Sequence, residues 1–322
     1  MRAIEIALSW SLVLGATGCP ADAYTLGAVD GGDTDAAVAT DDGGTAAEPT
    51  ATTDATGTTG TADGTNPVDP VPMVKAYSSN AFNGLGSGTW HANAGWLLVV
   101  DAAADAVYRV DPANVVDYLV PSSGAVGVGV DADGTPLIAT SAPPQILAVP
   151  PGQDGTAIAT GAPLVTPQTL VSTAAGDRYI ADAGASAVLR LAADGALTVG
   201  QAGLDEPRGL AVHPDGTALY VGERAGSVLR MTIGADGSLG APASVFDAAS
   251  TLDGLCIDDD ANLYVAGPSG LEVFAEDGEP WGTIPLPAPA LDCTFGGADG
   301  GMLLVMTATT IYSLDARVAG PP

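Results

Sequence analysis

The chain has 322 residues, 43 of them glycine, and a formal net charge of −29. Its nine basic residues include a single lysine, Lys75, so it lacks the clustered positive charge that phosphate backbones require. We therefore expect no nucleic-acid partner. An acidic surface favours cations, but it does not specify a fold.

The N-terminal segment, residues 1–18, has a charged start and an apolar run of signal-peptide length, too short for an ordinary transmembrane helix. Small residues lead directly into Cys19, so the segment resembles a bacterial lipoprotein signal, with Ala16 where leucine is usual. This resemblance implies a lipid anchor at Cys19 and a location in the bacterial cell envelope, on the periplasmic face or the cell surface. The alternative is an ordinary secretory signal cleaved near Ala21 or Ala23. Both alternatives predict export.

The next segment, residues 19–72, consists mostly of Thr, Ala, Gly and Asp. Residues 20–72 contain ten acidic side chains and no Lys or Arg. With few large apolar side chains and one sign of charge, the segment cannot bury enough surface to offset the entropy of ordering. We predict an acidic, disordered tether that holds a domain away from a membrane.

Residues 73–322 repeat one pattern of an apolar strand, an acidic or glycine turn, a second strand such as LYV, and a third strand such as VLRL. The repeats are residues 88–111, 125–150, 169–195, 209–237, 254–278 and 293–315. Their first turns recur about every 40 residues, a spacing typical of propeller blades. The turn residues are Gly95, Gly134, Gly176, Gly216, Ala261 and Gly300. Six repeats predict an all-β, six-bladed β-propeller, with residues 73–79 adding an outer strand to the last blade.

One part of the repeat region resembles a known family. Residues 251–315 contain LDGLCIDDDANLYVAG, a GxxVF strand, a GTIPLP connection and an FGGADG blade start. They resemble the senescence marker protein/gluconolactonase family, which includes regucalcin-like lactonases. The resemblance implies a lactone or ester hydrolase. It also implies a divalent cation at one mouth of the central channel, held by Glu, Asn and Asp, with a second Asn contacting the substrate. The cation would polarise the carbonyl, and the Asp would help to activate water.

These family positions are only partly matched in this chain. The family Asp is Asp253, but the Glu position is Gly86, the metal-binding Asn position is Arg208, and the substrate-contacting Asn maps to Gln168. A guanidinium about 4 Å from a doubly charged ion is repelled by roughly 8 kcal/mol at an effective dielectric of about 20. We infer that Arg208 occupies the place of the cation and pairs with Asp253. We expect no cofactor, with a Ca²⁺-type cation on Asp253 as the alternative.

Two functions remain open. The first is a lactone or ester hydrolase with a degraded metal site, using Asp253 for catalysis. The second is a non-catalytic propeller that binds a small molecule or an envelope protein, because EPRGLAVHPDGTALYV also resembles the blades of NHL-type interaction propellers. For both we expect a monomer that contacts the membrane only through the lipid at Cys19.

Two smaller features complete the sequence predictions. Cys256 and Cys293 lie at the starts of strands in neighbouring repeats, and we favour buried free thiols, with a disulfide as the alternative. The acidic triplet Asp258–Asp260 lacks the ordered spacing of a calcium-binding loop, so we expect a solvated turn.

Overall fold

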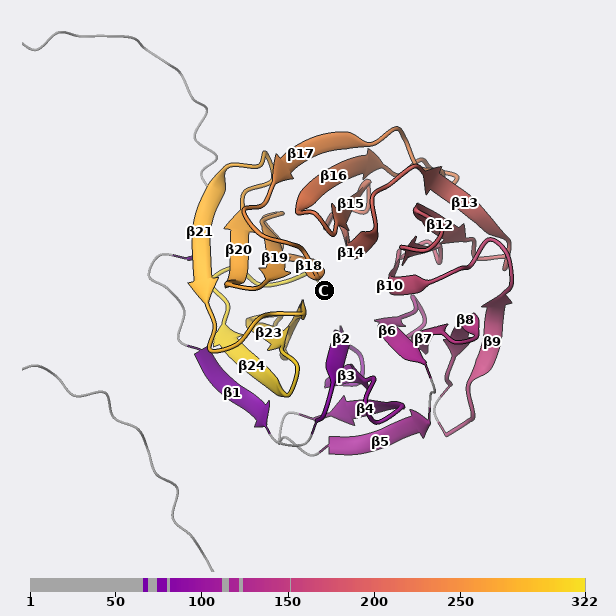
Figure 1. Ribbon diagram of the computed structural model, residues 1–322, viewed down its shortest axis with the longest axis horizontal. Coiled ribbons are helices and arrows are strands. Elements are labelled where there is room, and N and C mark those ends of the chain that lie inside the picture. The colour runs from indigo at the N-terminus through magenta and orange to yellow at the C-terminus, as the bar shows by residue number, and fades with distance from the viewer. Residues whose placement is uncertain are drawn as a thin grey trace, which may run out of the picture. The chain divides into compact units, whose positions relative to one another are not determined.

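The computed structural model describes residues 66–68, 74–79, 82–111, 116–121, 124–150 and 152–321. The described residues form 24 strands in six four-stranded antiparallel sheets arranged as a ring (Figure 1). The predicted signal peptide, the anchor residue Cys19 and all but 66–68 of the predicted tether lie outside the described residues. Within the described part of the chain, no helix has both the length and the apolar character that a membrane crossing requires.

Each of the first three blades is a meander of four consecutive strands, running from the axis outward. Blade 1 contains β2 (Leu85–His91), β3 (Trp96–Asp101), β4 (Ala106–Val110) and β5 (Val116–Pro121). Blade 2 contains β6 (Ala125–Val130), β7 (Pro136–Ser141), β8 (Pro144–Ala148) and β9 (Thr156–Thr160). Blade 3 contains β10 (Pro167–Ser172), β11 (Arg178–Asp182), β12 (Ala187–Leu191) and β13 (Leu197–Ala202).

The last three blades complete the ring. Blade 4 contains β14 (Pro207–Val212), β15 (Ala218–Glu223), β16 (Ser227–Thr232) and β17 (Ala243–Asp247). Blade 5 contains β18 (Gly254–Ile257), β19 (Leu263–Gly267), β20 (Gly270–Phe274) and β21 (Pro280–Pro285). Blade 6 contains β22 (Asp292–Gly296), β23 (Met302–Met306), β24 (Thr310–Asp315) and, as its outer strand, β1 (Val74–Ser79).

The six-bladed architecture confirms the sequence prediction. The first turn of each blade has a residue in the left-handed region at every predicted position, including Ala261 with φ +62°. Strand β1 pairs with β24, so the N-terminal end of the propeller closes the last blade (Figure 1). Because the closing strand comes from the opposite end of the sequence, opening the ring requires breaking this pairing.

The hydrophobic core is divided among the contacts between neighbouring blades. In the described part of the chain, six buried clusters each contain residues of two adjacent blades. Tyr220 of blade 4, for example, is fully buried in the cluster that contains Leu263 of blade 5. Each blade is therefore packed against the next one. The alternating apolar residues of the strands are buried at these contacts between blades, and they stabilise the ring without forming a single central core.

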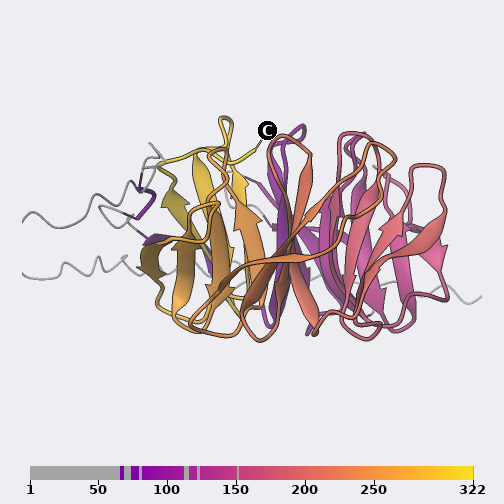
Figure 2. The same ribbon diagram turned by 90° about the horizontal axis from the view of Figure 1, so that it is seen from above.

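Close packing at the axis explains two glycines of the inner strands. A Cβ atom on Gly127 would lie 2.2 Å from the carbonyl oxygen of Gln168, and one on Gly254 would lie 2.5 Å from Asp292 Oδ1. Neither contact is sterically possible, so only glycine permits the inner strands to approach each other this closely. Figure 2 shows the ring edge-on, with the blade strands running across its thickness.

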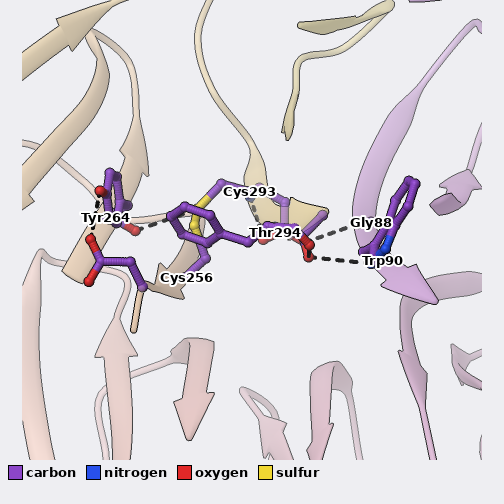
Figure 3. Close-up of a disulfide and its surroundings, with 9 residues drawn as sticks. Gly88, Trp90, Cys256, Tyr264, Cys293 and Thr294 are labelled. Atoms are coloured by element: carbon purple, nitrogen blue, oxygen red, sulfur yellow. Dashed lines mark hydrogen bonds between the residues drawn. A yellow bond between two sulfur atoms is a disulfide. The ribbon is translucent and has the colours of Figure 1, made fainter. Parts of the chain in front are cut away.

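The preference for free thiols was wrong. Cys256 on β18 and Cys293 on β22 form a disulfide that joins blades 5 and 6, with their Cα atoms 5.7 Å apart (Figure 3). The two cysteines are 37 residues apart in the sequence, and this separation does not indicate how close they lie in space. The two inner strands lie side by side at the axis, within the Cα range that a disulfide needs.

The prediction of a solvated turn at residues 258–260 was wrong for one of the three. Asp259 and Asp260 are exposed, but the side chain of Asp258 is completely buried. It accepts hydrogen bonds from the Asn262 side chain and from the Tyr264 hydroxyl, at 2.9 Å each on Oδ2. Asp258 is therefore a structural residue that holds the first hairpin of blade 5.

Candidate functional site

The inner strands bring one equivalent residue from each blade to the same mouth of the channel. In each blade, the strand pair nearest the first hairpin turn serves as the reference, and in blade 1 this pair is His91 and Trp96. The equivalent residue lies four positions before the inner-strand member of that pair, so in blade 1 it is Ser87. The equivalent residues are Ser87, Val126, Gln168, Arg208, Asp253 and Asp292. Because the strands share direction and register, their first side chains converge near the axis.

These six residues line one cavity with a volume of about 160 Å³, which we call the mouth cavity. Its remaining lining residues are Gly86, Thr169 and Leu291. The structure thus brings together Gln168, Arg208 and Asp253, the three residues that the sequence placed at the channel mouth, and it adds Asp292. The cavity combines one cation, two carboxylates and an amide.

Arg208 does not form the predicted ion pair with Asp253. Its Nη1 atom donates a hydrogen bond to Gln168 Oε1 at 3.1 Å, and its Nη2 atom lies 3.6 Å from Glu206 Oε2. Gln168 lies on the neighbouring inner strand, β10, and Glu206 lies in the turn just before β14. The guanidinium therefore contacts these two acceptors instead of Asp253. The Nε atom of Arg208 is buried and makes no hydrogen bond to the described residues.

Asp292 was missed by the sequence analysis. Its Oδ2 atom accepts a hydrogen bond from the Gly88 N–H at 3.1 Å, and its Oδ1 atom accepts one from the Cys293 N–H at 2.9 Å. Burial raises the pKa of Asp292 to about 7, although the Gly88 and Cys293 N–H groups favour the charged form. A signal existed in the sequence, because the Leu-Asp pair at 252–253 recurs at 291–292, one repeat later.

A larger cavity, of about 490 Å³, occupies the channel behind the mouth, and we call it the channel cavity. It is lined by later residues of the inner strands, including His91, and by Pro321 near the C-terminus. Thr169 and Asp292 line both cavities. Asp292 therefore lies where the mouth cavity and the channel cavity adjoin.

The mouth residues do not fit the divalent cation that the family resemblance implies. Gly86 offers no side-chain oxygen, and the guanidinium of Arg208 lies in the same cavity as Asp253. Among the described residues, no three His, Cys, Asp or Glu side chains are grouped so that they could hold a metal ion. The chemistry of this donor set suits a carbonyl or carboxylate oxygen better than a cation.

The architecture and the site define a six-bladed propeller with a small polar cavity at one channel mouth. The family model for the SMP-30/Gluconolactonase/LRE-like region matches residues 86–309, more than half of the chain. The protein belongs to this family, as residues 251–315 suggested.

Individual relatives agree with this assignment. A gluconolactonase from Zymomonas mobilis is 28% identical over 267 residues, which covers 68% of this chain and 74% of that protein. The structure of a gluconolactonase from Xanthomonas campestris superposes with a TM-score of 0.69 at 23% identity, covering 76% of this chain and 89% of the other. The calcium-binding protein regucalcin from Agrobacterium tumefaciens gives a TM-score of 0.68 at 17% identity, covering 77% and 95%. At these identities the two structures establish the shared fold.

Proposed function

We propose that the protein hydrolyses a small lactone or ester at the mouth cavity, with Arg208 and Gln168 in the place where its relatives would hold a cation. The observation that carries it is the guanidinium of Arg208, which lies in the mouth cavity beside Gln168 and Asp253.

A guanidinium can perform part of the work of a cation in this reaction. During hydrolysis, negative charge develops on the carbonyl oxygen, and a positioned donor stabilises that charge more than the ground state. Arg208 carries a positively charged guanidinium, and its hydrogen bond to Gln168 and its proximity to Glu206 restrict its position. In this proposal the mouth residues no longer hold a metal ion, but Arg208 still supplies positive charge to the carbonyl oxygen of the substrate.

The cellular setting is part of the same proposal. We propose export to the bacterial cell envelope, a lipid anchor at Cys19, and a monomer whose partner is a small molecule. The Cys256–Cys293 disulfide supports export, because such bonds persist in oxidising compartments outside the cytoplasm. The lipoprotein-like sequence around Cys19 supports the anchor.

The test measures hydrolysis of a panel of sugar lactones and small esters in the presence of EDTA. We expect turnover by the wild type and a loss in kcat/KM of about 100-fold for Arg208→Ala. The matched control is Arg224→Ala, which removes a half-exposed arginine that also lies near Glu206 but does not line the mouth cavity. Equal losses in both variants contradict the role of Arg208. Binding of the lactones without turnover by the wild type favours the non-catalytic propeller.

A further inference from the structure

Hydrolysis needs a group that accepts a proton from water, and the mouth cavity offers two carboxylates. Asp253 comes just before β18, and its side chain forms no hydrogen bond or ion pair with another described residue. Asp292 is held at both oxygens by backbone N–H groups of Gly88 and Cys293. A base with a fixed position reacts more efficiently than one that must first be ordered.

We propose that Asp292 is the catalytic residue that takes the proton from the attacking water, a role that rests on the proposed hydrolysis at the mouth cavity. Its position between the two cavities carries the proposal. Asp292 lines both the mouth cavity, which also contains Arg208, and the channel cavity. In the proposed reaction the substrate lies in the mouth cavity beside Arg208, and water reaches the carboxylate from the channel cavity. No family position mapped onto this chain includes Asp292.

The disulfide next to this carboxylate fixes the strands that carry both acidic groups. Cys293 directly follows Asp292 on β22, and its partner Cys256 lies three residues after Asp253. Figure 3 shows the disulfide beside the strand that carries Gly88 and Trp90. From this strand, β2, the Gly88 N–H donates a hydrogen bond to Asp292 Oδ2 and the Trp90 N–H donates one to Thr294 Oγ1. Three strands of three blades therefore restrict the position of the Asp292 side chain.

The proposed step is balanced without any oxidant or reductant. The water oxygen bonds to the carbonyl carbon while one water proton passes to the carboxylate of Asp292. The carbonyl electron pair moves to the oxygen held by Arg208. When the tetrahedral intermediate collapses, the carbon–oxygen bond to the leaving alcohol breaks, and that oxygen takes the proton from Asp292. A lactone yields one hydroxy acid, and an ester yields an acid and an alcohol.

The charges around Asp292 agree with a base that works near neutral pH. Burial raises the pKa of its carboxyl group to about 7, close to the ideal for general base catalysis at that pH. The charged or titratable residues that line the two cavities with it are Arg208 on β14, Asp253 before β18, His91 on β2 and Asp131 after β6. Asp131 is paired with Arg178, so it adds no unpaired negative charge near Asp292. Burial lowers the pKa of His91, which favours its neutral form.

The experiment compares kcat and KM of the wild type, Asp292→Asn, Asp253→Asn and the exposed control Asp299→Asn from pH 5 to 9, in EDTA. For Asp292→Asn we expect kcat to fall at least about 100-fold, with KM within about threefold of the wild type. We expect the wild-type kcat/KM to rise with pH and level off above about 7, and this inflection to disappear in Asp292→Asn.

Two other results overturn the assignment to Asp292. One is a kcat of Asp292→Asn within a few-fold of the wild type, and the other is an unchanged inflection near pH 7 in that variant. A large loss of kcat in Asp253→Asn alone assigns the base to Asp253 instead. Failure of the proposed function gives a different result, because the wild type itself then shows no turnover.

A readout that does not depend on activity accompanies the kinetics. With ¹³C-carboxyl-labelled aspartate, one NMR resonance of the wild type should titrate near pH 7 and be missing from Asp292→Asn. Far-ultraviolet circular dichroism checks that the variant is folded. Absence of such a resonance in the wild type contradicts the proposal even if hydrolysis occurs.

Discussion

Arg208 Nη1 lies 3.1 Å from Gln168 Oε1, and this hydrogen bond joins the inner strands of blades 3 and 4 at the channel mouth. It places a permanent positive charge in the mouth cavity together with Asp253. The guanidinium would repel a cation at this position, and it would attract the carbonyl oxygen of the proposed substrate.

Rebuilding the family ligands should restore cation binding. The space next to Gly86 is open, because a Cβ atom there would meet nothing closer than the Val126 carbonyl oxygen at 3.9 Å. The double variant Gly86→Glu, Arg208→Asn therefore places Glu, Asn and Asp253 around one point. We expect calcium affinity at least about tenfold above that of the wild type, measured by isothermal titration calorimetry.

The single variant Gly86→Glu is the control for this design. It adds a carboxylate but keeps Arg208, and we expect that carboxylate to pair with the guanidinium instead of binding calcium. Strong calcium binding by the wild type, at a site that Asp253→Ala abolishes, contradicts our interpretation of the mouth residues.

Removal of the disulfide should destabilise the ring. The Cys256–Cys293 bond closes a loop between residues separated by 37 positions. The chain-entropy model predicts that the Cys256→Ser, Cys293→Ser double variant loses between about 3 and 5 kcal/mol of unfolding free energy. Urea denaturation measures this loss. Reductant should lower the stability of the wild type and leave the double variant unchanged, and an equal response of both proteins would argue against the bond.

The buried carboxylate of Asp258 should be essential for blade 5. It accepts hydrogen bonds from Asn262 and Tyr264, and Asn262 Oδ1 in turn accepts one from Trp281 Nε1 at 2.7 Å. Asp258→Ala leaves these buried donors without their acceptor, and we expect a loss of about 3 kcal/mol in urea denaturation. The exposed neighbour gives the control, because Asp259→Ala should change stability by less than about 0.5 kcal/mol. Similar losses in the two variants would contradict the network.

The raised pKa of Asp292 also predicts how stability depends on pH. Burial raises this pKa from its ordinary value of 3.8 to about 7. Between these values the folded protein keeps a proton that the unfolded chain has released, so this contribution to stability is lost as pH rises from about 4 to about 7. The full pKa shift would correspond to a loss of about 4 kcal/mol in unfolding free energy. We expect a smaller loss, because the side chain is partly exposed.

Comparison with Asp292→Asn isolates this contribution. Other carboxylates titrate in both proteins, so the difference in urea-unfolding free energy between variant and wild type reflects Asp292. We expect this difference to shift in favour of the variant between pH 4.5 and pH 7.5. A difference that stays constant across this range means that Asp292 titrates normally.

The fold could be predicted from the repeats because local interactions determine them. Turn residues such as Gly134 and Ala261, spaced at blade length, indicated the number of blades, and the structure has a left-handed residue at each turn. The family positions mapped onto this chain placed Asp253 and Arg208 at the channel mouth, and in the structure both residues line the mouth cavity.

The errors all concern contacts between side chains. The sequence placed Cys256 and Cys293 at strand starts in neighbouring repeats but could not give their distance. It also paired Arg208 with Asp253, whereas the structure pairs it with Gln168. It also placed Asp258 in a solvated turn because the acidic triplet lacks the spacing of a calcium-binding loop, whereas its side chain is buried. Such contacts depend on the packing of strands from different repeats, which residue types do not specify.

By itself, the sequence determined the class of fold, the register of the repeats and the acidic character of the protein, since these follow from local periodicity and composition. Only the tertiary structure decided which carboxylates share a cavity with Arg208, that Asp292 joins them, and that a disulfide holds their strands together. The physical reason is that the ring brings six distant strand starts to one axis, where burial, charge and hydrogen bonding depend on distances in space.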